Sequence, residues 1–196
     1  GEKKIPVIAG PNGVESHKLM VEVAKSLVNN NLKIIRGHAY KPLTFPYRSK
    51  YYKESKSEGM DIMDDIKKSY NLKVVTEVTE IKYLDRICET ADILQIGSRN
   101  MQNLELLKET ALTRKPIILK RHFGASLRDF LGAAEHILIE KNHNLIFCER
   151  GVSIPHTHRD TSRFALDIQA IPAFKELSKY PIISDPSHAS FWAPWV

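Results

Sequence analysis

Residues 116–121 of this 196-residue chain read Pro116-Ile117-Ile118-Leu119-Lys120-Arg121. The run is continuously apolar until it ends on two cations. Apolar residues without alternation are typical of a parallel strand that is buried on both faces. Residues 127–139 follow with apolar side chains at helical spacing and predict an amphipathic helix. The stretch therefore predicts a strand followed by a helix, with positive charge at the carboxyl end of the strand.

The same pattern recurs along the whole chain. Further apolar runs occupy residues 5–9, 33–36, 73–78, 93–96, 145–148 and 181–184. Amphipathic stretches such as 17–29 and 59–69 separate them. Strict alternation of seven strands with helices predicts a parallel α/β fold. Because no linker rich in Gly, Pro or Ser interrupts the pattern, we expect residues 1–196 to form a single domain.

Two architectures fit this alternation, an open doubly wound sheet and a closed (β/α)8 barrel. An open sheet concentrates its site at one switch point, whereas polar residues here follow nearly every strand. This distribution favours the (β/α)8 TIM barrel, whose loops ring a single site. A barrel has eight strands, so the prediction is a barrel that lacks the last helix, strand and helix in this chain.

The chain carries a formal net charge of +6, from 29 Lys and Arg against 23 Asp and Glu. A nucleic-acid partner is one reading, but the positive residues are scattered and no basic run with interleaved aromatic residues stands out. A pocket for a small polyanion is the other, and the spacing of the cations favours it. The apolar runs are too short to span a bilayer. Cys88 and Cys148 indicate neither a disulfide framework nor a thiolate metal cluster, and we expect a cytoplasmic protein.

Five cations follow successive predicted strands: Arg36, Lys41, Arg99, Lys120 and Arg150. Each taken alone could be an ordinary salt-bridge partner. In a barrel, all five point into the same bowl. Together they exceed what one carboxylate needs, whereas a small ligand with both phosphate and carboxylate would use them. We therefore expect such a ligand.

Eight ordered segments resemble one enzyme family. They are Gly10-Pro11 with Glu15-Ser16, Ala39-Tyr40-Lys41-Pro42 with Thr44, Val75-Thr76-Glu77, Gln95-Ile96-Gly97-Ser98-Arg99-Asn100, Leu119-Lys120-Arg121, Cys148-Glu149-Arg150-Gly151, Leu166-Asp167-Ile168 with Ile171-Pro172, and Asp185-Pro186-Ser187-His188. Their order and spacing resemble the 3-deoxy-D-arabino-heptulosonate 7-phosphate (DAHP) synthases of the compact I-beta type. The sister 3-deoxy-octulosonate 8-phosphate synthases match less well around Lys41 and Asp185.

The resemblance implies a transferase of aromatic amino-acid biosynthesis, the shikimate pathway. The C3 carbon of phosphoenolpyruvate would attack the aldehyde of erythrose 4-phosphate, water would add at C2, and phosphate would leave. By motif, Lys41, Glu77 and His188 would take part in catalysis. Substrate binding would fall to Arg36, Lys41, Pro42, Thr44, Arg99, Lys120, Arg150 and Asp185. The resemblance also implies a homo-oligomer, and a single catalytic domain over residues 1–196 without an N-terminal regulatory domain. From the composition we expect no nucleic-acid or membrane partner.

The sequence departs from the family at the metal site. Metal-dependent members have cysteine where this chain has Asn12, and an amide is a poor substitute for a thiolate on a soft divalent metal. His188 matches the histidine ligand, while the glutamate and aspartate ligands lie beyond the segment that ends this chain. The family implies a divalent metal, and Asn12 resembles the solution of metal-free octulosonate-phosphate synthases.

Leu43 is the second departure, because the family usually has arginine at that position to bind the phosphate of the acceptor. Arg48 or Lys50 could compensate for the missing charge. Alternatively, the enzyme would condense phosphoenolpyruvate with a different aldehyde. A third alternative is a non-catalytic relative that binds a phosphorylated metabolite.

Overall fold

The structure is a computed structural model that describes residues 5–41, 54–154, 164–190, 194 and 196. Two compact units divide the chain, Gly1–Leu94 and Gln95–Val196. Strand β4 (Ile93–Ile96) lies at the boundary between them. The prediction of a single catalytic domain stays a prediction.

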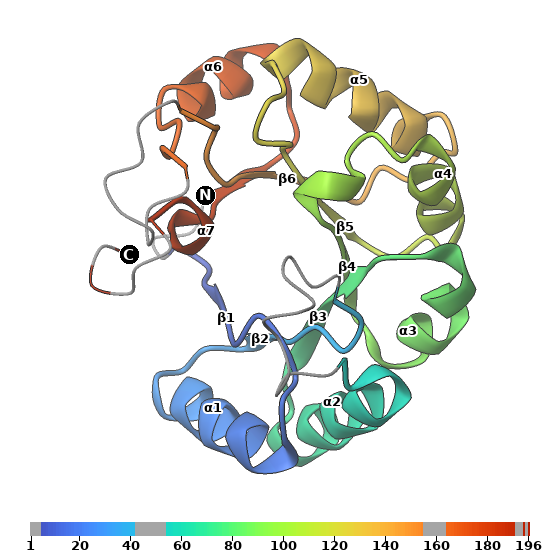
Figure 1. Cartoon of the computed structure of the whole chain (residues 1–196), viewed down its shortest axis with the longest axis vertical. Helices are drawn as coiled ribbons and strands as arrows, with labels where there is room; N and C mark the ends of the chain where they lie inside the picture. The colour runs from blue at the N-terminus through green and yellow to red at the C-terminus, as the bar shows by residue number, and fades with distance from the viewer. Residues whose placement is uncertain (1–4, 42–53, 155–163, 191–193, 195) are drawn as a thin grey trace. The chain divides into compact units, whose positions relative to one another are not determined.

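The first unit alternates strands with helices. It contains β1 (Ile8–Ala9), α1 (His17–Asn29), β2 (Ile34–Arg36), α2 (Lys56–Tyr70), β3 (Lys73–Val78), the 3-10 helix η1 (Ile81–Tyr83) and α3 (Leu84–Thr90). β1 pairs with β2 and β2 with β3, both in parallel. Figure 1 shows α1 and α2 on one side of these strands.

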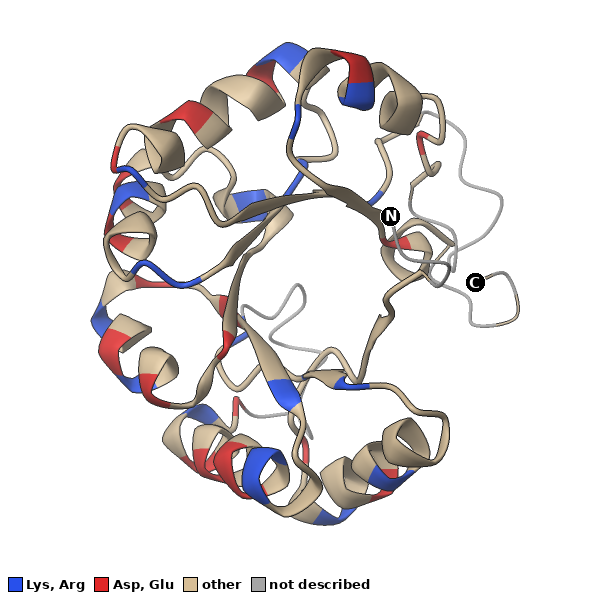
Figure 2. Cartoon of the chain, turned by 180° about the vertical axis from the view of Figure 1, so that it is seen from behind, with Lys and Arg blue, Asp and Glu red and all other residues tan. Residues whose placement is uncertain are grey.

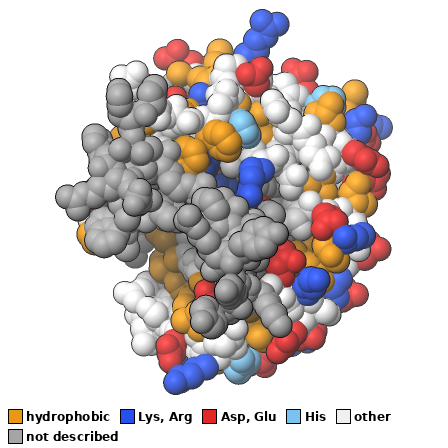
Figure 3. Space-filling view, viewed as in Figure 1, with side chains coloured by type: hydrophobic (Ala, Val, Ile, Leu, Met, Phe, Trp, Pro, Cys, Tyr) orange, Lys and Arg blue, Asp and Glu red, His pale blue; other side chains and the backbone are white. Residues whose placement is uncertain are grey.

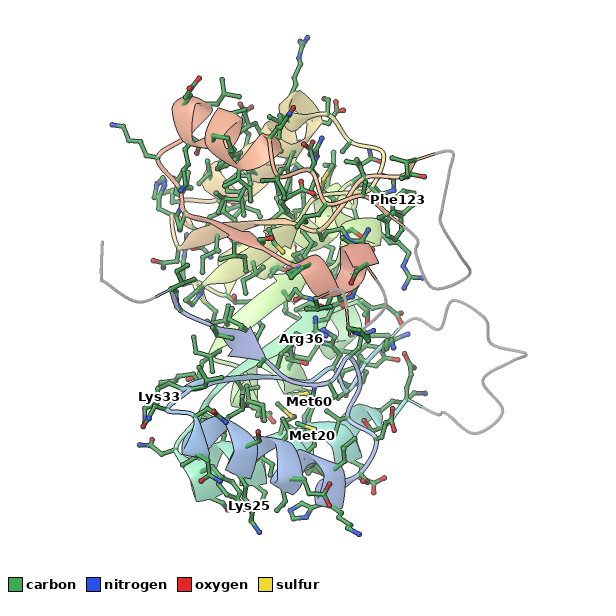
Figure 4. The ribbon with its side chains drawn as sticks, turned by 90° about the vertical axis from the view of Figure 1, so that its left-hand side faces the viewer. Met20, Lys25, Lys33, Arg36, Met60 and Phe123 are labelled. Atoms are coloured by element: carbon green, nitrogen blue, oxygen red, sulfur yellow. The ribbon has the colours of Figure 1, made fainter. Side chains whose placement is uncertain are left out.

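The core of the first unit lies between its helices and its strands. Met20 and Ala24 of α1, Ile35 of β2, Ile66 of α2 and Val74 of β3 are all fully buried. Figure 4 shows Met20 beside the equally buried Met60 of α2. Side chains three and four residues apart on α1 share one face, so the helix can bury a continuous stripe against the strands.

The second unit repeats this arrangement. It contains η2 (Ser98–Asn100), α4 (Leu104–Leu112), β5 (Ile117–Lys120), α5 (Leu127–Leu138), β6 (Leu145–Glu149), α6 (Ala170–Leu177), β7 (Ile182–Ser184) and α7 (Pro186–Ser190). β5, β6 and β7 pair in parallel, in that order. The aromatic rings of Phe130, Phe147 and Phe174 form a buried cluster, in which Phe147 lies 4.8 Å from Phe130 and 4.3 Å from Phe174 between centroids.

Local sequence signals account for the ends of several helices. Ser16 caps α1 by accepting the backbone N–H of Leu19, and Ser126 forms a capping box with Asp129 at the start of α5. Such caps satisfy N–H groups that have no partner inside the helix. Asn71 ends α2 in the left-handed conformation, which asparagine tolerates better than most residues.

The α/β class predicted from the sequence is confirmed, because parallel strands alternate with helices in both units. The helix predicted at 17–29 is His17–Asn29, and the one predicted at 59–69 begins earlier, at Lys56. The strand predicted at 5–9 was wrong in its first half, since β1 comprises only Ile8–Ala9. Pro6 has no N–H to donate to a neighbouring strand, and Ile5 is 90% exposed.

Charges of both signs are interspersed on the helices of each unit (Figure 2). On the face seen in Figure 3, basic and acidic side chains likewise alternate among the residues that the structure describes there. Within the described ranges, no helix is long and apolar enough to cross a bilayer.

Candidate functional site

Parallel pairing places the carboxyl ends of neighbouring strands at one edge of the first unit. Arg36 ends β2 and lies opposite Val75 of β3. Val75 precedes Glu77 by two residues. Figure 4 labels Arg36, the last residue of β2, and Lys33, which directly precedes the strand. Gly10 supports this edge, because a Cβ on it would lie 2.0 Å from the carbonyl oxygen of Arg36 and its φ is +144°. The edge thus needs glycine at position 10.

His38 is buried beside Glu77 and orients it. The backbone N–H of Glu77 donates to His38 Nδ1 at 2.9 Å, and His38 Nε2 lies 3.7 Å from Glu77 Oε2. Because Nδ1 accepts a hydrogen bond, the neutral imidazole carries its proton on Nε2, the atom that faces the carboxylate. Sequence reasoning missed this role, although a histidine two residues after a buried strand was a usable signal.

Lys41 is half-buried, and two contacts fix the backbone at this position, one made by Lys41 itself and one by its neighbour Tyr40. Its N–H donates to Glu54 Oε1 at 2.8 Å. The preceding Tyr40 stacks on Tyr83, with 4.1 Å between ring centroids and 17° between planes. Of the predicted acceptor-binding residues, Pro42 and Thr44 lie outside the described residues, as does Leu43.

Lys120, Asp185 and His188 meet at the carboxyl edge of the second unit. Lys120 ends β5, while Asp185 and His188 follow β7. Lys120 Nζ lies 2.5 Å from Asp185 Oδ2 and 3.3 Å from His188 Nδ1, and His188 Nδ1 lies 2.7 Å from the same Asp185 oxygen. The structure therefore brings these three predicted residues together.

Asp185 is the centre of this cluster. Its second oxygen accepts the hydroxyl of Ser187 at 2.7 Å and the backbone N–H of His188 at 3.1 Å. Burial alone would raise the pKa of Asp185, but the hydrogen bond from His188 and the charge of Lys120 hold it well below its usual value. The carboxylate is therefore ionised, and it balances the charge of a lysine side chain that is only 4% exposed.

The other two cations predicted for this unit differ in exposure. Arg150 follows β6, is buried, and its guanidinium carbon lies 4.1 Å from the centroid of the Phe164 ring. Arg99 lies on η2 and is exposed.

A buried ion cluster beside this edge was missed as a unit by sequence reasoning. Arg121 donates to Glu149 and Asp167, both at 2.9 Å, and to the carbonyl of Ala125. Burial lowers the pKa of Arg121, yet the two carboxylates raise it above its ordinary value. Glu149 also accepts the backbone N–H of Gly151 at 2.7 Å. These contacts tie the segments after β5 and β6 together, so Arg121 has a structural role.

The described donor atoms do not by themselves fit a divalent metal site. Within the described ranges, no three His, Cys, Asp or Glu side chains group to hold a metal ion. Asn12 is an exposed amide, and Lys120 already engages the carboxylate of Asp185. Burial raises the pKa of the Cys148 thiol to about 12, so in the absence of a metal ion its side chain is neutral. His188 is the one predicted ligand found at the edge.

Comparison with known proteins adds the deciding observation. A family model described as the DAHP synthetase I family matches residues 1–191. The chain belongs to the DAHP synthetase I family. The resemblance seen in the ordered motifs is thereby confirmed.

Two curated relatives illustrate this DAHP synthetase I membership. The phospho-2-dehydro-3-deoxyheptonate aldolase of Thermotoga maritima is 38% identical over 189 residues, which cover 96% of this chain and 54% of that protein. The 2-dehydro-3-deoxyphosphooctonate aldolase of Fusobacterium nucleatum is 26% identical and is matched over 67% of its length. The chain thus spans about half the length of the first relative.

Solved structures of the Thermotoga maritima DAHP synthase superpose on most of this chain. One has a TM-score of 0.84 at 38% identity and is matched over 94% of this chain and 52% of its own. A truncated form has a TM-score of 0.85 at 35% identity, with 97% of this chain and 67% of its own covered.

Proposed function

We propose that this chain belongs to an enzyme that condenses phosphoenolpyruvate with erythrose 4-phosphate to a 3-deoxy-heptulosonate 7-phosphate and releases phosphate. Membership of the DAHP synthetase I family supports this reaction. The observation that carries it is the buried ammonium of Lys120, held at the end of β5 by the carboxylate of Asp185. Lysine side chains are seldom buried, because removing the ammonium from water costs free energy that its contacts must offset.

In the second unit, Lys120 and Arg150 bind the anionic groups of phosphoenolpyruvate, and Arg99 adds a further positive charge. Asp185 positions the ammonium of Lys120 and the ring of His188. A histidine that donates from Nδ1 to a carboxylate holds its Nε2 lone pair ready to take up a proton or a metal ion. Every step assigned here to this chain uses its own side chains.

In the first unit, Arg36 contributes a positive charge for an anionic substrate group. Lys41 polarises the aldehyde carbonyl and stabilises the alkoxide that forms when C3 of phosphoenolpyruvate attacks. Glu77, held by His38, orients the water that adds at C2. The proposal assigns Pro42 and Thr44 to the acceptor aldehyde.

The fold that accompanies this proposal is the (β/α)8 barrel. The alternation of parallel strands and helices within each unit supports it. A cytoplasmic homo-oligomer remains part of the proposal.

The test is phosphate release from phosphoenolpyruvate with erythrose 4-phosphate, arabinose 5-phosphate or no aldehyde, each with and without EDTA. We expect release that depends on erythrose 4-phosphate. Lys120→Met should reduce it at least about 100-fold, because the substrate loses a buried charge partner. Lys108→Met is the matched control, since Lys108 is exposed on α4.

Two outcomes would contradict the proposal. Release that depends on arabinose 5-phosphate would assign a different aldehyde to the site. Binding of phosphoenolpyruvate without release of phosphate under any condition would assign a non-catalytic role. Loss of activity in EDTA would assign a divalent metal to the reaction.

A further inference from the structure

Phe164 supports the guanidinium group of Arg150. The guanidinium carbon lies 4.1 Å from the centroid of the Phe164 ring, well within the range of a cation–π interaction. Arg150 is 5% exposed, so water weakens this attraction little. A phenyl ring also has no lone pair that accepts an N–H. The contact therefore orients a cation without competing with oxygen ligands for its donors.

The backbone around Phe164 is fixed by hydrogen bonds. Ala165 and Val152 form an antiparallel bridge, with N–H to carbonyl distances of 2.8 and 3.0 Å in the two directions. Gly151 allows the ring's own residue to approach, because a Cβ there would lie 2.9 Å from the Phe164 Cβ and its φ is +99°. The position of Phe164 relative to Arg150 is thus determined on both sides of the contact.

Phe123 extends the support into the segment after β5. Its ring lies 5.4 Å from the Phe164 ring between centroids, tilted by 32°, and its carbonyl accepts the N–H of Ser153 at 2.8 Å. Figure 4 marks Phe123 in the second unit. The segment that follows Lys120 is therefore packed against the ring that holds Arg150.

The Phe164 ring differs from a carboxylate as a contact for a cation. A carboxylate takes up N–H donors of the cation and cancels part of its charge, as Glu149 and Asp167 do for Arg121. An aromatic face attracts the guanidinium of Arg150 by its quadrupole and adds no negative charge. The ring contact itself therefore does not reduce the charge that Arg150 offers to a ligand.

We propose that Phe164 is a positioning residue, which acts through Arg150 to set the affinity of the second unit for phosphoenolpyruvate. This inference rests on the proposed function, in which Arg150 binds that substrate. Phe123 contributes indirectly, by packing against Phe164.

The test is the dissociation constant of phosphoenolpyruvate, measured by calorimetry on the full chain carrying Phe164→Leu. Leucine keeps the apolar volume and removes the aromatic face. We expect the constant to rise about 3- to 30-fold. KM for phosphoenolpyruvate should rise in parallel with little change in kcat, because the contact serves binding. Phe164→Tyr keeps the aromatic face and should bind about as tightly as the unmodified chain.

Two further variants separate positioning from packing. Phe123→Leu removes a ring that does not contact the cation, so its effect should be less than about 3-fold. In an Arg150→Met background, Phe164→Leu should cause no further loss, since the ring then has no cation to position. Should Phe164→Leu not fold by circular dichroism, Phe164→Met replaces it.

The outcomes also distinguish this inference from the proposed function. If the unmodified chain binds no phosphoenolpyruvate, the proposed function fails and the inference fails with it. If the unmodified chain binds and Phe164→Leu binds equally well, only the inference is overturned. Equal losses in Phe123→Leu and Phe164→Leu, or further loss in the Arg150→Met background, would likewise assign the rings to packing alone.

Discussion

At the scale of single residues, His38 shows how a buried side chain can hold a neighbouring carboxylate in place. Its Nδ1 accepts the backbone N–H of Glu77, and its ring is 1% exposed. The imidazole thereby fixes both the backbone at the end of β3 and the direction of the Glu77 carboxylate. The backbone N–H of Glu77 therefore requires a hydrogen-bond acceptor where His38 has its Nδ1 atom.

Replacement of His38 tests this requirement. His38→Leu removes the acceptor at a buried N–H and should lower the free energy of unfolding by about 1–3 kcal/mol. His38→Asn can place its amide oxygen near the position of Nδ1, so its loss should be smaller. Urea unfolding followed by circular dichroism measures both. Equal losses in the two variants would show that ring packing matters and the hydrogen bond does not.

At the scale of elements, two glycines inside helices lie in opposite surroundings. Gly132 of α5 has open space where a Cβ would be. At Gly59 of α2, a Cβ would lie 2.8 Å from the Ser55 Cβ and 2.9 Å from the Ala39 Cβ. Helix propensity favours alanine over glycine at both positions, so only the surroundings distinguish them.

Gly132→Ala should therefore stabilise the chain by about 0.5–1 kcal/mol. Gly59→Ala should destabilise it, because the crowding at α2 outweighs the gain in propensity. Thermal unfolding of the two variants beside the unmodified chain measures the difference. Stabilisation by both substitutions would contradict the packing described for Gly59.

Asp92 joins two elements of the first unit. Its carboxylate accepts the N–H of Val74 in β3 at 2.9 Å and lies 3.0 Å from Lys67 Nζ of α2. Burial alone would raise the pKa of Asp92, but the Val74 N–H and the Lys67 ammonium lower it below its usual value. Such a carboxylate contributes stability above its unfolded pKa, near about 4, and loses that contribution as the pH falls through its lower folded pKa.

Asp92→Asn should accordingly lower the free energy of unfolding by about 2 kcal/mol at neutral pH. The difference from the unmodified chain should shrink as the pH falls below about 4. Asp64→Asn is the control, because Asp64 pairs with Lys68 on the surface of α2 and should change little. Chemical unfolding across this pH range provides the measurement, and a difference that does not depend on pH would refute the electrostatic account.

At the scale of the whole molecule, hydrophobic patterning predicted the alternation of strands and helices because burial on both faces leaves a direct trace in the sequence. The position of Lys120 and Asp185 after two predicted strands likewise predicted that both residues belong to the site. The pairing between them could not be predicted, since it depends on where two side chains 65 residues apart point. The pattern of charges did not distinguish Arg121, which is buried and bound by carboxylates, from the exposed Arg99. Such a pattern does not show which charged side chains are buried.

Asp185 has one further consequence. Any anion that binds Lys120 meets an ammonium whose charge is already balanced by a carboxylate oxygen 2.5 Å away. The ion pair as a whole is neutral, so a singly charged solute such as chloride or acetate gains little net electrostatic attraction from it. A ligand with several negative charges can use the N–H donors of Lys120 that Asp185 leaves over and can reach other cations as well. The built-in counter-ion therefore disfavours monoanions before any recognition of shape begins.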